Sequence, residues 1–451
     1  MTKFAMFSRR KFLTGVAVAA GSALLPHDVL AEPIAEPLSH ETELIPERIT
    51  LSLTADPSHS QAVTWRTGKA ISSVQAQIAP ASANPNFEKA TVSVTASATK
   101  ANIPGGKIVG EYSAQFNGLS PNSRYTYRVG DGATWSEWNS FQTAGDKHGA
   151  FRFLYLGDEQ NSIKSLWSRS IRAAYGKAPD ARFIVHAGDL LAEGYDDRLW
   201  GEWSYAMGFI GAVMPSLPTP GNHDLHRAPG KPDSNEVLSV SPLWRQHFTL
   251  PMNGPRGVDE LKQQAYYIDY QDVRLISLDV NVYSNEAFAE SAKQRVGDAQ
   301  LAWLERLLQD NPNRWTVVIQ HQPMYPIAKG RDYVEMRNAL LPLYDKYHVD
   351  LVLQGHDHCY ARTHKLAAGK VVSPSQSGTI YAISVSGPKM YEIGDSFAHL
   401  RAKVLGHTQA FQVIEVDGDT LTYNAYAIEG EQIDRFRLVK QVSGATTYSD
   451  L

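Results

Sequence analysis

The chain has 451 residues, of which 43% are hydrophobic, and its formal net charge is −4 at pH 7 with neutral histidines. This length exceeds that of one ordinary hydrophobic core, so it predicts two domains. The weakly acidic balance, without a basic stripe, argues against nucleic acid as a partner bound through its phosphate backbone.

The N-terminal residues have the order of an export signal. Arg9 and Arg10 precede a short apolar run, and Val29-Leu30-Ala31 resembles a cleavage site. This order is typical of twin-arginine (Tat) signals, by which bacteria export folded proteins. We expect the Tat machinery to act on residues 1–31 and to leave a periplasmic or secreted protein without a membrane span. An uncleaved anchor is the alternative, although the run is shorter than the ~20 apolar residues of a span.

Residues 44–145 have the alternating hydrophobicity of β-strands. The stretches RITLSL, AVTWRT and RYTYRV place every second side chain on one face, and turn residues separate them. Leu119, Pro121 and Tyr125 have the spacing of a tyrosine corner, in which a phenol holds a crossing loop. We therefore predict an all-β sandwich of the fibronectin type III kind that serves for packing or binding.

The pattern changes near residue 146. Short apolar runs such as FRFLYL, ARFIVH and WTVVIQ alternate with amphipathic helical segments, and the last third returns to strands. This alternation predicts an α/β two-sheet sandwich flanked by helices over residues 150–440. Function is expected at the carboxyl ends of its strands.

Residue types that bind metals follow these runs, in five blocks: Gly157-Asp158, Gly188-Asp189, Gly221-Asn222-His223-Asp224, His321 and Gly355-His356-Asp357-His358. Each block alone is typical of a turn or of a core histidine. Together they would converge on one rim, where oxygen donors mixed with imidazole suit divalent first-row metals. The single cysteine, Cys359, rules out an internal disulfide and a zinc site built from several thiolates.

The order GD, GD, GNHD, H, GHDH resembles that of the calcineurin-like metallophosphoesterases. With the preceding sandwich it is most similar to the purple acid phosphatase branch, in a bacterial form. The resemblance implies two metal ions, the first held by Asp158 and His358, the second by Asn222, His321 and His356, and both by Asp189. It also implies that His223 lies beside the leaving group without binding metal. Strand alternation would direct Asp357 away from its two histidine neighbours.

Two departures from the family pattern fall on the first metal. Ala192 stands where the purple branch has a tyrosine, and Tyr195 could replace that tyrosine only in a remodelled loop. Gln160 stands where related enzymes have a histidine, and its side chain either binds the metal or holds another ligand. Without a phenolate ligand we expect a colourless protein with two divalent ions, from manganese, iron and zinc.

The expected function is metal-dependent hydrolysis of phosphate monoesters, with a small phosphoester as substrate. Two cations about 3.5–4 Å apart can generate a hydroxide at neutral pH, and a protonated His223 can donate to the departing oxygen. Lys329, Arg331 and His226 are candidate substrate contacts, with solvated loop charges as the alternative for the first two. Two other functions stay open: a phosphodiesterase acting on nucleotides or phospholipid headgroups, and a non-catalytic exported metal-binding protein.

Overall fold

The computed structural model describes residues 43–103, 106–226, 239–283, 290–442 and 444–451. The export signal predicted at residues 1–31 lies outside this part. Within it, no helix combines the length and apolar character needed to cross a membrane.

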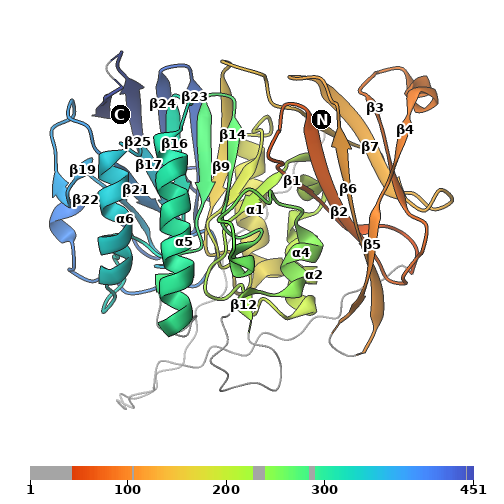
Figure 1. Cartoon of the computed structure of the whole chain (residues 1–451), viewed down its shortest axis with the longest axis horizontal. Coiled ribbons are helices and arrows are strands. Elements are labelled where there is room, and N and C mark those ends of the chain that lie inside the picture. The colour runs from red at the N-terminus through yellow and green to blue at the C-terminus, as the bar shows by residue number, and fades with distance from the viewer. Residues whose placement is uncertain (1–42, 104–105, 227–238, 284–289, 443) are drawn as a thin grey trace, which may run out of the picture. The chain divides into compact units, whose positions relative to one another are not determined.

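The N-terminal part is a sandwich of two antiparallel layers (Figure 1). One layer consists of β1 (Glu47–Ser52), β2 (Ser60–Thr67), β6 (Ile108–Asn117) and β5 (Ser97–Asn102). The other consists of β4 (Val92–Thr95), β3 (Gln75–Pro80), β7 (Arg124–Gly130) and β8 (Asn139–Gln142). Trp65, Phe116 and Phe141 are buried between them. The Tyr125 hydroxyl accepts a hydrogen bond from Ser120 N at 2.8 Å, which is the loop contact predicted for a tyrosine corner.

The first of these layers continues into a larger sheet. Parallel pairing of Ser52 with Ser216 joins β1 to β11, which gives an eleven-stranded sheet in the order β26-β25-β24-β23-β9-β10-β11-β1-β2-β6-β5. Its remaining strands are β9 (Phe151–Leu156), β10 (Ile184–His186), β11 (Ser216–Pro218), β23 (Ala410–Asp417), β24 (Thr420–Ala427), β25 (Gln432–Lys440) and β26 (Thr446–Asp450). Strands β9, β10 and β11 are mutually parallel.

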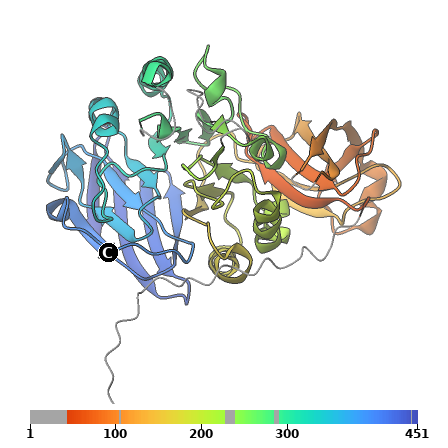
Figure 2. The ribbon, with the colours of Figure 1, turned by 90° about the horizontal axis from the view of Figure 1, so that it is seen from below.

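A second sheet of seven strands lies face to face with the C-terminal half of the first (Figure 2). It contains, in spatial order, β14 (Tyr266–Tyr270), β15 (Val273–Ser277), β16 (Trp315–Ile319), β17 (Leu351–Gln354), β21 (Ile380–Ile383), β18 (Tyr360–Thr363) and β22 (Arg401–Leu405). The Tyr155 hydroxyl on β9 donates to carbonyl oxygens of this second sheet, at 3.1 Å in the case of Ala382. The buried phenol therefore fixes one sheet against the other.

Helices cover the outer faces of these two sheets (Figure 1). They are α1 (Ser168–Lys177), α2 (Asp197–Met207), α3 (Phe209–Val213), α4 (Pro242–His247), α5 (Glu290–Gln309) and α6 (Val334–Lys346). Two short ribbons complete the described strands: β12 (Leu225–His226) with β13 (Ser239–Val240), and β19 (Leu366–Ala367) with β20 (Lys370–Val371). The predicted order, an all-β domain followed by an α/β two-sheet domain flanked by helices, is confirmed.

Candidate metal centre

The predicted ligand blocks lie in loops at the carboxyl ends of parallel strands from both sheets. Asp158 follows β9, Asp189 follows β10, and Asn222 follows β11. His321 follows β16, and the block around His356 follows β17. Because the two sheets lie face to face, loops separated by up to two hundred positions along the chain meet at one end of the two-sheet domain, where His356 N donates to Asp158 Oδ2 at 2.6 Å.

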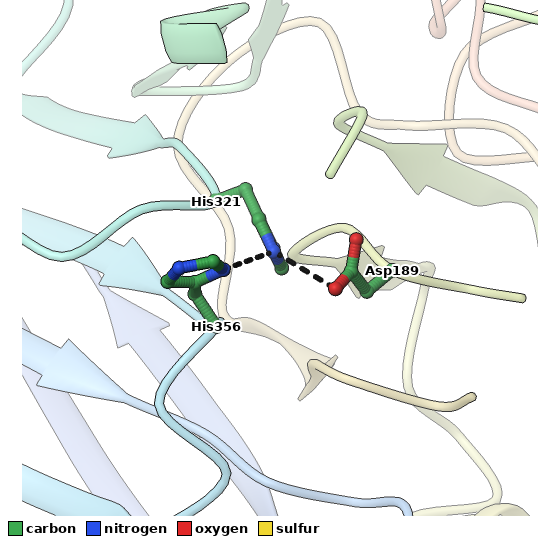
Figure 3. Close-up of side chains that lie close together, drawn as sticks. All are labelled: Asp189, His321 and His356. Carbon is green, nitrogen blue, oxygen red and sulfur yellow. Dashed lines mark hydrogen bonds and ion pairs between the residues drawn. The ribbon is translucent and has the colours of Figure 1, made fainter. Parts of the chain in front are cut away.

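Two groups of side chains are close enough to hold a metal ion each. Asp189, His321 and His356 form one group, and Asp158, Asp189 and His358 form the other. In each group the donor atoms lie within 4.8 Å of one another. Figure 3 shows the first group, in which His321 Nε2 lies 3.2 Å from Asp189 Oδ2 and 3.1 Å from His356 Nδ1. Asp189 therefore belongs to both groups.

The backbone of these loops is bent in ways that bring the carboxylates and imidazoles inward. Asp158 and Asp189 both have a φ of 53°, in the left-handed region that side chains seldom adopt. Glycine is needed beside them because a Cβ on Gly221 would lie 2.2 Å from Asp189 Oδ1. A Cβ on Gly188 would lie 2.5 Å from His321 Nδ1. The glycines of the predicted blocks thus leave room for the ligands.

Each imidazole has one nitrogen held by the protein outside the group. His321 Nδ1 donates to a backbone carbonyl, that of Ala187, at 2.8 Å. His358 Nδ1 donates to the Lys389 carbonyl at 3.0 Å. Because a carbonyl only accepts, Nδ1 carries the proton in both rings, and in the neutral form of each ring Nε2 keeps its lone pair for a metal. His356 is oriented the other way, with Nε2 2.5 Å from the Tyr333 hydroxyl and Nδ1 facing His321.

Several oxygens of the centre have no hydrogen-bond partner within the described residues. They are Asp158 Oδ1, Asn222 Oδ1 and Gln160 Oε1, all inaccessible to solvent. Buried polar atoms are normally paired, so three orphaned acceptors in one place are suited to hold a cation. Oxygens mixed with imidazoles are the donors that divalent first-row metals accept. The residues present therefore fit the two divalent ions that the family resemblance implies.

The buried carboxylates and imidazoles of the centre shift one another's pKa values. Burial lowers the pKa of His321, but the Asp189 carboxylate outweighs burial and raises it to about 9. Burial also acts on Asp189, in the opposite direction, and the His321 charge outweighs it and holds the Asp189 pKa below its usual range. Burial, and then the Lys389 charge, lower the pKa of His358 to about 3. The Asp189 carboxylate thus favours positive charge beside it, at the Nε2 of His321.

Gln160 contacts ligands of both groups. Its Nε2 donates to Asp189 Oδ2 at 2.8 Å and lies 3.3 Å from His358 Nε2. Its Oε1 is one of the orphaned oxygens. The side chain therefore orients Asp189 and also offers an oxygen to a metal, so both predicted roles stay open.

His223 is placed beside the centre by two contacts. Its backbone N–H donates to Asp189 Oδ1 at 2.9 Å, and its ring Nδ1 donates to the Ala192 carbonyl at 2.8 Å. His223 is in neither donor group. Ala192, which replaces the family tyrosine, thus contributes its backbone to the orientation of this imidazole. Tyr195 is half-buried.

Of the three residues predicted to contact the substrate, the structure gives side-chain partners for Arg331 and Lys329. Arg331 Nη1 donates to the His356 carbonyl at 2.7 Å and to Asp357 Oδ1 at 2.9 Å, so this cation is already paired with a buried carboxylate. The Lys329 side chain is 75% exposed, and its ammonium lies 3.6 Å from Glu392. His226 pairs with β13 through its backbone, and its side chain lies outside the described part.

Strand alternation, which we expected to direct Asp357 away from its two histidine neighbours, does not apply to the last block, because this block is not part of a strand. Strand β17 ends at Gln354, and His356 and His358 lie in a loop with φ values of 75° and 48°. Asp357 does point away from the two histidines, because its Oδ2 accepts hydrogen bonds from Ala328 N at 3.0 Å and from Ile327 N. Hydrogen bonds, and not the pleat of a strand, therefore set these directions.

Sequence reasoning gave no role to Asp224, which holds two of the ligand loops together. Its Oδ2 accepts from Asp189 N and from Gly221 N, both at 2.8 Å, and its Oδ1 accepts from Leu190 N at 3.1 Å. Its burial, followed by the nearby Asp189 charge, raises its pKa to about 8. Its position in the GNHD block is the sequence feature that could have indicated this role. Lys389 and Tyr333 were also missed, and they belong to none of the blocks.

Comparison with known families agrees with this architecture. Residues 46–143 match the model of the purple acid phosphatase N-terminal domain. Residues 145–360 match the model of the calcineurin-like phosphoesterases. The second match spans all the predicted metal ligands.

Curated relatives carry related descriptions. Probable purple acid phosphatase 20 of Arabidopsis thaliana is 27% identical over 251 residues, covering 54% of this chain and 53% of the relative. The phosphoenolpyruvate phosphatase of Allium cepa is 26% identical over 294 residues, covering 61% and 55%. Fe(3+)-Zn(2+) purple acid phosphatase 12 of A. thaliana is 26% identical over 264 residues, covering 55% and 51%. The chain thus spans about half the length of these relatives.

Two solved structures share the fold. The purple acid phosphatase PPD1 from yellow lupin (Lupinus luteus) seeds superimposes with a TM-score of 0.71 at 17% identity, over 89% of this chain and 75% of the lupin chain. The structure of PhoD superimposes with a TM-score of 0.64 at 12% identity, over 92% of this chain and 93% of PhoD.

Proposed function

We propose that this chain, which carries a calcineurin-like phosphoesterase domain behind a purple acid phosphatase N-terminal domain, hydrolyses phosphate monoesters with two divalent metal ions. The observation that supports this best is the pair of donor groups that share Asp189. A shared carboxylate suits two ions close together, whereas a purely structural site normally closes around one ion.

The chain's own residues divide the work of binding. Asp158 and His358 would hold the first ion and Asp189 both ions, while Asn222, His321 and His356 would hold the second. When bound, two divalent ions would neutralise negative charge on a phosphate ester and make water a better nucleophile. Manganese, iron(II) and zinc all fit these donors, and the absence of a tyrosine at Ala192 favours a colourless protein.

His223 is the residue we assign to proton transfer. Its Nδ1 is committed to the Ala192 carbonyl, which fixes the plane of the ring and leaves Nε2 as the nitrogen that can carry a second proton. In the imidazolium form it would donate that proton to the departing alcohol oxygen. A general acid of this kind typically contributes a rate factor of ~10²–10⁴.

Two substitutions separate metal binding from proton transfer. Asp189→Ala should abolish both metal retention and turnover, because one side chain serves both ions. His223→Ala should lower turnover by roughly 10²-fold or more and keep the metal content of the parent protein. Elemental analysis of both purified variants checks this, and loss of metal from His223→Ala would make His223 a ligand and refute its assigned role.

The substrate class is tested with p-nitrophenyl phosphate and bis-p-nitrophenyl phosphate in parallel, on protein loaded with manganese, iron(II) or zinc. Faster turnover of the monoester is expected. Preference for the diester would replace the proposal with a phosphodiesterase. Absence of turnover with all three metals would support a non-catalytic metal-binding protein.

We also propose that the chain is exported to the periplasm or the cell exterior by the Tat machinery. The arginine pair in residues 1–31 supports this. Changing Arg9 and Arg10 together to lysine should leave the protein in the cytoplasm of a bacterial host, whereas unchanged export would contradict the proposal.

A further inference from the structure

A group of charged and aromatic side chains borders the metal centre beside His358. The Tyr391 ring packs edge-on against the His358 imidazole, with ring centroids 4.6 Å apart. Two cations lie over the same tyrosine: Lys389 Nζ at 5.1 Å and Arg331 Cζ at 4.7 Å from its centroid. We call Arg331, Lys389 and Tyr391 the basic rim.

The two cations of the basic rim differ in how their charge is balanced. Arg331 is paired with the buried Asp357. The Lys389 ammonium has neither an ion pair nor a hydrogen bond among the residues that the structure describes, and the side chain is half-buried. The Lys389 backbone is fixed all the same, because its carbonyl accepts from His358 Nδ1 at 3.0 Å.

An unbalanced lysine beside a two-metal centre is electrostatically unfavourable on its own. The ammonium and the metal ions would repel one another, and partial burial weakens the screening by water. An anion that bridges the space between them relieves this repulsion. The ammonium and the His358 imidazole contact the same tyrosine ring, so a substrate whose phosphoryl group is held at the metals and whose alcohol part extends along that ring would bring its next group to Lys389.

We propose that Lys389 is a specificity residue that binds a second anionic group, so that the preferred substrate is a phosphate ester whose alcohol part carries a carboxylate or a further phosphate. This inference rests on the proposed function. Tyr391 is the surface along which the substrate would lie, and Arg331 keeps that surface in place through Asp357 and the His356 carbonyl.

The test measures binding without turnover. Propylphosphonate, 3-phosphonopropionate and propane-1,3-diphosphonate have chains of similar length and end in a methyl group, a carboxylate and a phosphonate. Calorimetric titration of metal-loaded protein should show that one or both probes with an anionic tail bind roughly tenfold more tightly than propylphosphonate, or better, which corresponds to about 1.4 kcal/mol. The carboxylate and phosphonate arms show which group the site prefers.

Variants assign that preference to one residue. Lys389→Gln should remove most of the preference, whereas Lys389→Arg should retain it because the charge stays. Lys329→Gln, at an exposed lysine paired with Glu392, should keep the full preference. Metal content measured on every variant shows whether the centre is intact.

Three results would overturn the inference: equal affinity of the unchanged protein for all three probes, an unchanged preference in Lys389→Gln, or loss of the preference in Lys329→Gln instead. If Lys389→Gln does not fold, Lys389→Met is the second neutral variant, and an unchanged preference in Lys389→Met overturns the inference in the same way. Failure of the proposed function is a separate result, because it appears as absent turnover of p-nitrophenyl phosphate and leaves the binding comparison intact.

Discussion

Hydrogen bonds with three neighbouring residues fix the position of Asp189. The His223 backbone donates to Oδ1, and the Gln160 amide donates to Oδ2. Asp224 holds the Asp189 backbone from the other side. A carboxylate fixed on both oxygens and at its own N–H is preorganised, so little of its freedom is lost when cations bind.

Gln160 provides a prediction at this scale. Gln160→Ala removes the amide that orients Asp189 and the orphaned Oε1, so we expect the ion at Asp158 and His358 to bind roughly 10–100-fold more weakly. The ion at His321 should be affected less. Dialysis against graded chelator followed by elemental analysis should show about one ion per chain at a concentration where the parent keeps two.

Gln160→Glu is the matched control, because it keeps an oxygen at the same place and loses the donor to Asp189. If this variant retains both ions, the oxygen is what matters and Gln160 is a ligand. If it loses the ion as Gln160→Ala does, orientation of Asp189 is the larger effect. Full retention of both ions by Gln160→Ala would contradict both roles.

Sequence motifs predicted which residues gather at the centre but not how they are held. The five blocks were recognisable because ligands and their glycines are neighbours in sequence. Lys389, Tyr391 and Tyr333 reach the centre from segments without a motif, through contacts that exist only in the folded chain. Residues 355–359 were predicted to form the end of a strand, because the apolar run before them does not show where the β-pairing stops.

At the scale of elements, the first turn of α2 is joined to the sandwich by a buried ion cluster. Asp197 accepts from Arg48 Nη1 at 2.7 Å and from Arg66 Nη1 at 2.9 Å. All three side chains are less than a tenth exposed. The arginines come from β1 and β2, so a single carboxylate connects two strands of the sandwich with a helix of the α/β part.

Asp197→Ala should therefore destabilise the protein strongly. It leaves two buried guanidinium groups without their shared partner, and breaking a buried pair in this way costs about 3–5 kcal/mol. Urea unfolding of metal-loaded protein measures the loss. Asp180→Ala is the control, because the Asp180 side chain is 66% exposed in its ion pair with Arg152, and exposed pairs contribute about 1 kcal/mol or less. Equal effects of the two substitutions would show that the buried cluster is not a major contributor.

Over the whole described chain, the sandwich and the α/β part share one sheet. The alternating patterns predicted each part, because periodicity is a local property. The pairing of β1 with β11 was not predictable, since it depends on a single register, Ser52 with Ser216, between segments far apart in the sequence. The joint is strengthened by Leu53 N donating to Ser216 O at 3.1 Å and by the Tyr127 hydroxyl donating to Ala212 O at 2.7 Å.

This continuity predicts that the metal-loaded protein unfolds in one cooperative transition. Two domains separated by a flexible linker would melt independently, whereas parts that share backbone pairing and a buried ion cluster lose both interactions together. Differential scanning calorimetry should give a single peak whose calorimetric and van't Hoff enthalpies agree. Tyr127→Phe removes one hydrogen bond across the joint and keeps the ring, so it should lower the temperature of that peak without splitting it. Two separable peaks in the unchanged protein, the smaller one also seen when residues 44–145 are heated alone, would show that the sandwich is an independent unit that the shared sheet does not couple.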